Sequence, residues 1–238
     1  MRTRGIQMIT SRIAKFKTTV QLITIIFILL SLSINPYFPI SNNKNFIGCR
    51  IPNNKIAIDL LKSASFPIAA PSANQATKIS STRSIHLTNY FKNKTLVLKG
   101  GITKIGLEST VIKTSKNNIK VLRLGSITIE EIKKKLPSYK ISIENYNSLR
   151  SPGNQKKHYS PNLPIRINAK RINKNESLLN FGKNNLKSKI FEYNLSTTGN
   201  LNEASKNFFH FLHLLDNIKC SRIAVAPIPN YGLGKTIN

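Results

Sequence analysis

Acidic residues and cysteine are scarce in this 238-residue chain, and both shortages exclude classes of protein. The two cysteines, Cys49 and Cys220, lie far apart, so they form no disulfide framework and no cluster of metal ligands. A secreted disulfide-rich domain, a zinc finger, a collagen-like chain and a coiled-coil rod are therefore excluded. No paired carboxylates, no Ser-His-Asp order and no His/Cys metal spacing stand out, so we assign no catalytic residue and no metal ligand.

The scarcity of acidic residues makes the chain strongly basic, because 37 Lys and Arg against 9 Asp and Glu give a net charge of +28. A surface of this kind attracts polyanions through contacts to phosphate that do not depend on base sequence. Compositional drift is the alternative, since Lys, Asn and Ile are abundant throughout and no Arg-rich helix concentrates the charge. With 40% hydrophobic residues, the chain is able to bury a core.

The first 34 residues combine several basic side chains with an apolar run over residues 20–34. This order fits a secretory signal peptide, whereas a membrane-spanning helix needs about 20 apolar residues. No small-residue cleavage site follows, and the run is rich enough in Ile and Thr to suit a buried strand equally well. An exported or membrane-tethered protein is therefore one hypothesis, and a cytoplasmic protein without a membrane partner is the one that we favour.

From residue 46 onwards, strand patterns alternate with helix patterns, which indicates an α/β fold. The expected elements are a strand at 46–50, a helix at 55–64, a strand at 66–70, a helix near 85–91, a strand at 95–99, and a hairpin of 108–114 with 119–125. Thr128 and Glu131 then form a capping box, which predicts a helix that ends before Pro137.

A polar, proline-containing stretch at 145–163 predicts a linker to a second, smaller α/β unit. The elements expected in that unit are strands at 164–168, 189–195 and 222–229 and a helix at 201–216. Residues 234–236 read Gly-Lys-Thr, like the end of a phosphate-binding P-loop. Residue 229 is Pro229, however, where that motif has its first glycine, and a P-loop needs a following helix, so we predict a glycine turn instead.

Polar residues cluster at the expected strand ends between positions 50 and 125. They are Arg50, Ser72, Asn74, Ser109 and Arg123. In an open α/β sheet, ligands bind where strand ends and loops converge. Small hydroxyl and amide groups hold phosphate oxygens, and arginine binds carboxylate or phosphate in a bidentate manner. Taken singly, each residue is as well explained as a turn former or a surface charge.

Taken in order, these residues resemble a known family. The strings RIPNNKIAIDLLKSASFPIAAPSAN (50–74), GLESTVI (106–112) and VLRLGSIT (121–128) are similar to the YrdC-like threonylcarbamoyl-AMP synthases. SPGNQKKHYSP (151–161) resembles the interdomain linker of the two-domain members, and GLGKTIN (232–238) resembles part of their C-terminal domain. The order of these motifs is specific, whereas PSAN alone is not.

The resemblance implies that the chain makes threonylcarbamoyl-AMP and pyrophosphate from threonine, bicarbonate and ATP with Mg²⁺, for modification of an adenosine beside the anticodon of certain tRNAs. It also implies a twisted mixed sheet with flanking helices. By motif, threonine is bound by Arg50, Ser109 and the backbone at Ala70. The ATP-binding residues are Ser72, Asn74, Ser80 and Arg123, and His158 and Tyr159 of the linker close over the site.

The resemblance divides the chain into an atypical basic and apolar segment (1–44), a partial YrdC-like domain (45–148), a linker (149–165) and a shortened C-terminal α/β domain (166–238). The sequence also departs from the family pattern. No Lys-x-Arg element precedes Arg50 in a matching context, and Ala76 and Thr77 replace the usual Ser-Gly after PSAN. An active enzyme, a degraded or split-gene remnant, and a non-catalytic basic RNA-binding module on the same scaffold all stay open.

Overall fold

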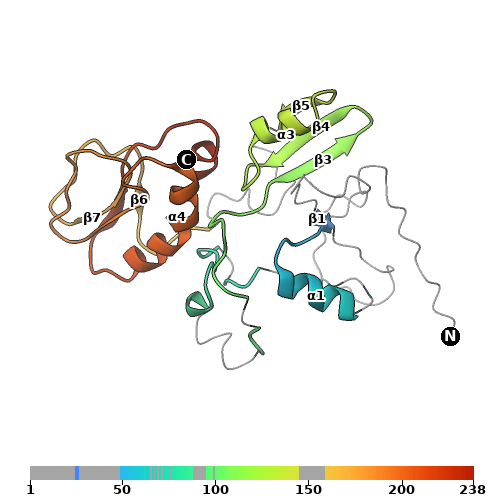
Figure 1. The fold of residues 1–238 in the computed structure, drawn as a ribbon. Helices are drawn as coiled ribbons and strands as arrows, with labels where there is room; N and C mark the ends of the chain where they lie inside the picture. The colour runs from blue at the N-terminus through green and yellow to red at the C-terminus, as the bar shows by residue number, and fades with distance from the viewer. Residues whose placement is uncertain are drawn as a thin grey trace.

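The computed structural model describes residues 25–26, 49–64, 66, 68, 70, 72–75, 77–87, 95–98, 100–144 and 159–238. These residues form three small sheets with flanking helices, a mixed α/β architecture (Figure 1). The predicted fold class is therefore confirmed. Most of the apolar run at 20–34 and the linker up to His158 lie outside the described residues. None of the helices in the described ranges combines the length and apolar character that a membrane span requires.

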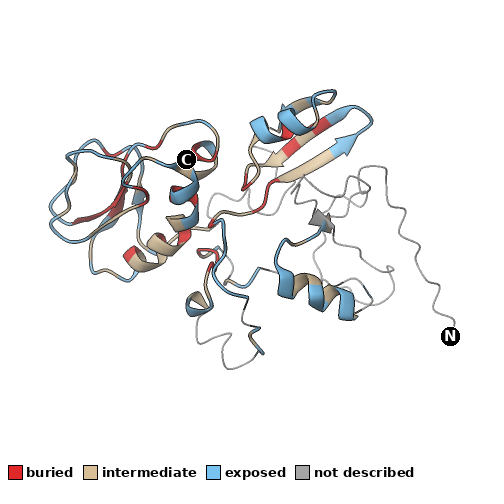
Figure 2. Ribbon diagram, viewed as in Figure 1, coloured by how far each residue is buried: buried red, intermediate tan, exposed pale blue. Residues whose placement is uncertain are grey.

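The first sheet pairs strand β1 (Ile25–Ile26) antiparallel with β2 (Cys49–Arg50), inside the strand predicted at 46–50. Helix α1 (Lys55–Ala64) follows with the bounds that its apolar spacing predicts. It has an apolar stripe but no buried residue, and Leu60 is 47% exposed (Figure 2). The described residues therefore leave the apolar face of α1 largely uncovered.

The second sheet has the order β3-β4-β5, with α3 packed against it. Its elements are β3 (Val111–Ser115), β4 (Asn118–Arg123), α3 (Ile129–Lys135) and β5 (Lys140–Ile143). Strands β3 and β4 form the predicted antiparallel hairpin, and β5 joins β4 in parallel. The capping box of α3 is confirmed, because Thr128 and Glu131 each accept a backbone N–H from the other. A small core of Ile119, Val121 and Ile132 holds the helix to the sheet.

The third sheet is entirely parallel and has the order β6-β9-β7-β8. Its elements are β6 (Ile165–Arg166), β7 (Glu176–Asn180), β8 (Glu192–Asn194), α4 (Leu201–Asp216), β9 (Arg222–Val225) and α5 (Gly234–Ile237). Helix α4 has the predicted bounds, and Phe209, Leu212 and Leu215 pack into the largest core of the described chain. Strands of a parallel sheet are buried in this way because the connecting helices lie on the faces of the sheet.

Expectations for local structure need correction at three places. The described residues of 66–70 and 95–99 form no strand. Of the helix expected near 85–91, the structure describes only residues 85–87, which follow or belong to a short 3-10 turn, η2 (Ser84–His86). Apolar runs that find no partner strand make no ladder hydrogen bonds, and exposure of Leu96 (90%) agrees with this. The predicted glycine turn at the C-terminal Gly-Lys-Thr is instead the single helical turn α5.

The segments before the linker, which we call the first part, contact the unit of the third sheet, which we call the C-terminal part. Ile79 is buried in the core formed by α4 and the parallel sheet. Gly106 donates its N–H to the carbonyl of Ser205 at 3.1 Å, and a Cβ at this glycine would lie 2.5 Å from the carbonyl oxygen of Lys206. Thr236 of α5 donates to the carbonyl of Gly125 at 3.1 Å. The predicted motifs thus lie at the junction of the two parts.

Candidate functional site

Arg123, at the end of β4, is the centre of a cluster of predicted site residues. Its Nε and Nη2 donate to the carbonyl of Ser109 at 3.1 and 2.9 Å, and Nη2 also donates to the Ser109 hydroxyl at 3.1 Å. Its Nη1 donates to the Tyr159 hydroxyl at 2.8 Å, and the guanidinium lies 5.9 Å from the centre of that ring. The guanidinium side chain is 13% exposed, so its charge is held in a largely dry environment.

Glu108 adds a carboxylate to this cluster. It accepts a hydrogen bond from the buried Ser80 hydroxyl and lies 3.7 Å from Nη2 of Arg123. We did not single out Glu108 from the sequence, although its place directly before Ser109 in GLEST is the signal that could have identified it. Serine hydroxyls, an arginine and a carboxylate within one cluster suit the binding of a charged polar ligand.

The segments GLEST (106–110) and LRLG (122–125) lie in close contact around Gly125. The N–H of Ser126 donates to the carbonyl of Glu108 at 2.8 Å, and the Thr110 hydroxyl donates to the carbonyl of Ile127 at 2.6 Å. A Cβ at Gly125 would lie 2.2 Å from the backbone nitrogen of Thr110. Glycine is therefore required here, because any side chain would push Ser109 and Arg123 apart.

Tyr159 reaches the cluster from the linker with its backbone in the left-handed region, at φ 54°. The neighbouring Ser160 pairs with the first part of the chain, since its N–H donates to the carbonyl of Thr77 at 3.0 Å. Burial raises the pKa of the Tyr159 phenol, and the nearby Arg123 opposes that rise. The hydroxyl is therefore protonated at neutral pH and accepts the hydrogen bond from Arg123.

The other predicted residues are placed differently. Asn74 lies within its own loop, where its Nδ2 donates to the carbonyls of Gln75 and Lys78 at 3.1 and 2.8 Å. Arg50, Ala70 and Ser72 are exposed, and within the described ranges no hydrogen bond or ion pair connects them to Arg123. His158 lies outside the described residues. The roles of all the predicted site residues stay predictions.

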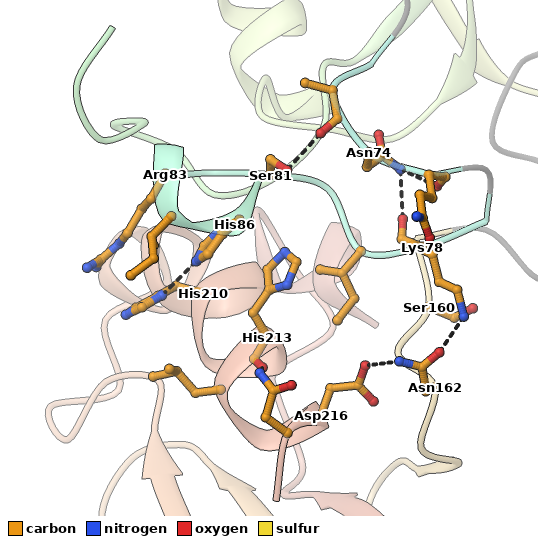
Figure 3. A pocket seen from close by; sticks show the side chains of 16 residues that line it. Asn74, Lys78, Ser81, Arg83, His86, Ser160, Asn162, His210, His213 and Asp216 are labelled. Carbon is orange, nitrogen blue, oxygen red and sulfur yellow. Dashed lines mark hydrogen bonds between the residues drawn. The ribbon is translucent and has the colours of Figure 1, made fainter. Parts of the chain in front are cut away.

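A cavity of about 690 Å³ lies between the Asn74 loop, the linker and α4 (Figure 3), and its lining includes Ser81 and Ser160, the chain neighbours of Ser80 and Tyr159. Asn74, Lys78, Ser160 and His213 are among its lining residues. Over the described part of the chain, no group of three or more His, Cys, Asp or Glu side chains is arranged to hold a metal ion.

Both halves of the chain match protein-family descriptions. Residues 11–125 match the family described as Telomere recombination (Sua5_yciO_yrdC), and residues 127–238 match the threonylcarbamoyl-AMP synthase C-terminal domain. Similar relatives are the threonylcarbamoyl-AMP synthases of Pyrococcus abyssi, 34% identical over 53% of this chain and 38% of the relative, and of Bacillus subtilis, 33% identical over 51% and 36%. The chain therefore spans less than two fifths of the length of these relatives.

Solved structures agree with this assignment. The protein in the crystal structure of P. abyssi Sua5 complexed with L-threonine has 26% sequence identity to this chain. The two structures superpose with a TM-score of 0.67, over 80% of this chain and 61% of that chain. A variant of the same protein, in which an adjacent histidine and tyrosine are alanine, is 25% identical, with a TM-score of 0.62 over 80% and 59%. The two matched domains follow one another along this chain as the motifs predict. The chain belongs to the two-domain YrdC/Sua5 family.

Proposed function

We propose that this chain is a threonylcarbamoyl-AMP synthase that acts in the threonylcarbamoyladenosine modification of tRNA. The observation that carries the proposal is the convergence of Ser80, Ser109, Arg123 and Tyr159 from four separate segments. The names of the relatives and the bound L-threonine of the P. abyssi structure support the same activity.

The cluster supplies groups of the right chemistry for two anionic substrates. Ser109 binds threonine, together with Arg50 and the backbone at Ala70. Arg123 binds the phosphates of ATP, together with Ser80 and the loop of Ser72 and Asn74. Mg²⁺ enters with ATP as part of the substrate. Because Arg123 already donates to Tyr159 and Ser109, ATP binding exchanges some of these hydrogen bonds for bonds to phosphate oxygens.

The reaction needs positioned substrates rather than a covalent nucleophile. The threonine amine and bicarbonate condense to a carbamate with loss of water. A carbamate oxygen then attacks the α-phosphorus of ATP, and the bond to the leaving pyrophosphate breaks. Charge builds up on phosphate oxygens during this step, and a dry, preorganised guanidinium such as that of Arg123 stabilises such charge. His158 and Tyr159 of the linker exclude water by closing over the site.

Pyrophosphate release by the purified chain tests the proposal. We expect release that requires threonine, bicarbonate and ATP together, and a loss of about 100-fold in Arg123→Met. Lys133→Met removes the same charge from an exposed position on α3 and is the matched control. A folded chain that releases no pyrophosphate above background, or an Arg123→Met chain as active as the control, would overturn the proposal.

tRNA is the proposed macromolecular partner, and a non-catalytic RNA-binding module is the second candidate function. The net charge of +28 favours both. We expect the affinity for tRNA to fall linearly with salt on a double-logarithmic plot, as phosphate contacts release counterions. No binding even at low salt would exclude both. A cytoplasmic location stays a prediction.

A further inference from the structure

Three of the four histidines of this chain meet where its two parts touch, although they come from positions far apart in the sequence. His86 belongs to η2 in the first part, whereas His210 and His213 lie one turn apart on α4 (Figure 3). The ring of His86 stacks on His213 with 4.1 Å between centroids, and its centroid lies 5.3 Å from that of His210. We call these three residues the histidine cluster.

The hydrogen bonds of His86 require neutral imidazoles on His86 and His210. The backbone N–H of Thr82 donates to Nδ1 of His86 at 3.1 Å, so that nitrogen carries no proton. The proton of His86 is therefore on Nε2, which donates to Nδ1 of His210 at 3.1 Å. Addition of a proton to either acceptor nitrogen replaces an attraction by a donor facing a donor.

His213 contacts the backbone of the segment that precedes His86. Its Nε2 lies 3.1 Å from the carbonyl oxygen of Ser80, an atom that only accepts, so Nε2 carries the proton. Ile79, the residue before Ser80, is buried in the core beneath α4. The loop from Ile79 to His86 is thus docked on α4 by one apolar anchor and the histidine cluster.

Burial lowers the pKa of all three imidazoles of the histidine cluster. The neighbouring Arg83 also disfavours protonation of His86 and His210, whereas Asp216 favours protonation of His213. Arg83 lies beside His86 and His210, and the described residues place no carboxylate within ion-pair distance of its guanidinium. Lys78 lines the same cavity from the loop, and Asp216 lines it from α4. Both Asp216 oxygens already accept hydrogen bonds, from Asn162 and from the backbone of Leu163, each at 2.8 Å.

We propose that the histidine cluster is a proton-sensitive latch, which docks the loop of residues 79–86 on α4 when His86 and His210 are neutral and releases it when they are protonated. The latch contacts the backbone at Ser80 and Thr82, directly beside the cluster around Arg123. Docking and release therefore control the geometry of that neighbouring site. The latch does not depend on the reaction proposed above.

The direction of the effect follows from proton linkage. Burial, with the neighbouring His213, His210 and Arg83, lowers the pKa of His86 to about 4. The docked state therefore loses stability as the pH falls through the ordinary histidine pKa of about 6.5 towards that value, because only the released state takes up the proton. For a half-exposed ring screened by water, we expect the docking equilibrium to fall roughly tenfold between about pH 7.5 and about pH 5.

Energy transfer between the two natural cysteines measures docking without any added residue. Cys49 lies in β2 of the first part and Cys220 lies just after α4, and both are half-buried. Burial raises the pKa of the Cys49 thiol, so labelling with pH-insensitive dyes is best done under mildly alkaline conditions. We expect the transfer efficiency of the full chain to change reversibly as the pH falls through the histidine range.

The double variant His86→Asn with His213→Gln is the decisive comparison. The first substitution keeps an acceptor oxygen in place of Nδ1 of His86, and the second keeps an N–H donor in place of Nε2 of His213. Neither amide titrates, and His210 has lost the His86 donor that its protonation would oppose. We therefore expect the transfer efficiency of the double variant to be flat over the same range, with unchanged far-UV circular dichroism. An unchanged efficiency in the natural chain, or an equal change in the double variant, would overturn the latch.

Imidazole carbon signals in NMR give a second test that needs no stable variant. We expect one histidine of the natural chain to titrate about two pH units below ordinary histidines. If all the assigned imidazoles of residues 86, 210 and 213 titrate at the ordinary value, the latch is wrong.

Discussion

The two parts of this chain differ in how they are stabilised. In the C-terminal part, Leu178, Leu195 and Leu215 are fully buried between α4 and a four-stranded parallel sheet. In the first part, the described residues form a core of only Ile119, Val121 and Ile132, and α1 buries no side chain. Buried apolar area is the main source of folding stability.

Contacts with the C-terminal part hold the segments of the candidate site in place. Ser80 follows Ile79, which is buried in the C-terminal core, and Arg123 precedes Gly125, whose carbonyl accepts a hydrogen bond from Thr236. Both Ser80 and Arg123 belong to the first part, yet the C-terminal part holds the segments that carry them. The C-terminal domain is therefore a support for the site as well as a neighbour.

The largest expected effect is the loss of a leucine from the C-terminal core. Leu215→Ala should lower the free energy of unfolding by about 3 kcal/mol, since it leaves a cavity in a fully buried place. Leu60→Ala on the exposed face of α1 is the matched control and should cost less than about 0.5 kcal/mol. Urea unfolding followed by circular dichroism measures both, and equal losses would show that the two parts do not differ in how their leucines stabilise them.

A buried carboxylate gives the C-terminal part a pH dependence of its own. A hydrogen bond from Arg166 lowers the pKa of Glu176 to about 2, and the carboxylate side chain is 2% exposed. Its stabilisation is therefore complete above the ordinary pKa of about 4.5 and is lost as the pH falls towards 2, by roughly 3 kcal/mol in all.

Glu176→Gln should remove that dependence. We expect the variant to be less stable by about 2 kcal/mol at neutral pH and to lose less on acidification than the natural chain. Unfolding midpoints measured at several pH values check this. Parallel pH curves for the two chains would show that Glu176 has no such role.

Gly106→Ala tests the junction between the two parts. The added methyl would lie 2.5 Å from the carbonyl oxygen of Lys206 and must push α4 away, which should cost about 1–3 kcal/mol. The control is Gly100→Ala, because the nearest atom there is a side-chain nitrogen of Asn54 at 3.6 Å. Hydrogen exchange of α4 amides should rise in Gly106→Ala alone, and equal exchange in both variants would contradict the junction.

The smallest expected effect on stability is the loss of a helix cap, which is tested once in each part. Thr128→Ala removes the cap of α3 and Asn200→Ala removes the cap of α4, and each should cost about 1 kcal/mol. The first change should destabilise only the second sheet, because α3 packs there. Protection of the Ile119 amide against hydrogen exchange should therefore fall in Thr128→Ala and not in Asn200→Ala, and an equal fall in both variants would contradict the prediction.

Local patterns in the sequence predicted the elements that depend on local interactions. The bounds of α1 and α4 follow from apolar spacing, and the start of α3 follows from its capping box. Strand β7 was missed because ESLLN contains a buried glutamate, Glu176, whose burial depends on its ion pair with Arg166 of another strand. The segments at 66–70 and 95–99 have strand composition, but a strand forms only with a partner.

The candidate site could be predicted only in part for the same reason. Motifs identified Ser80, Ser109 and Arg123 as residues of one site, and the structure brings these three together around Glu108. The partnership of His86 with His210 joins residues 124 positions apart. No periodicity or spacing signals a contact of that kind, because it depends on how the two parts dock.

Transfer of labelled carbon from bicarbonate into an adenylate tests the central claim most directly. The purified chain is incubated with ¹³C-bicarbonate, threonine and MgATP, and the products are identified by mass spectrometry. The account predicts ¹³C-labelled threonylcarbamoyl-AMP from the natural chain and from Lys133→Met, and at most a trace from Arg123→Met. No labelled adenylate from a folded chain, or an equal yield from Arg123→Met, would contradict it.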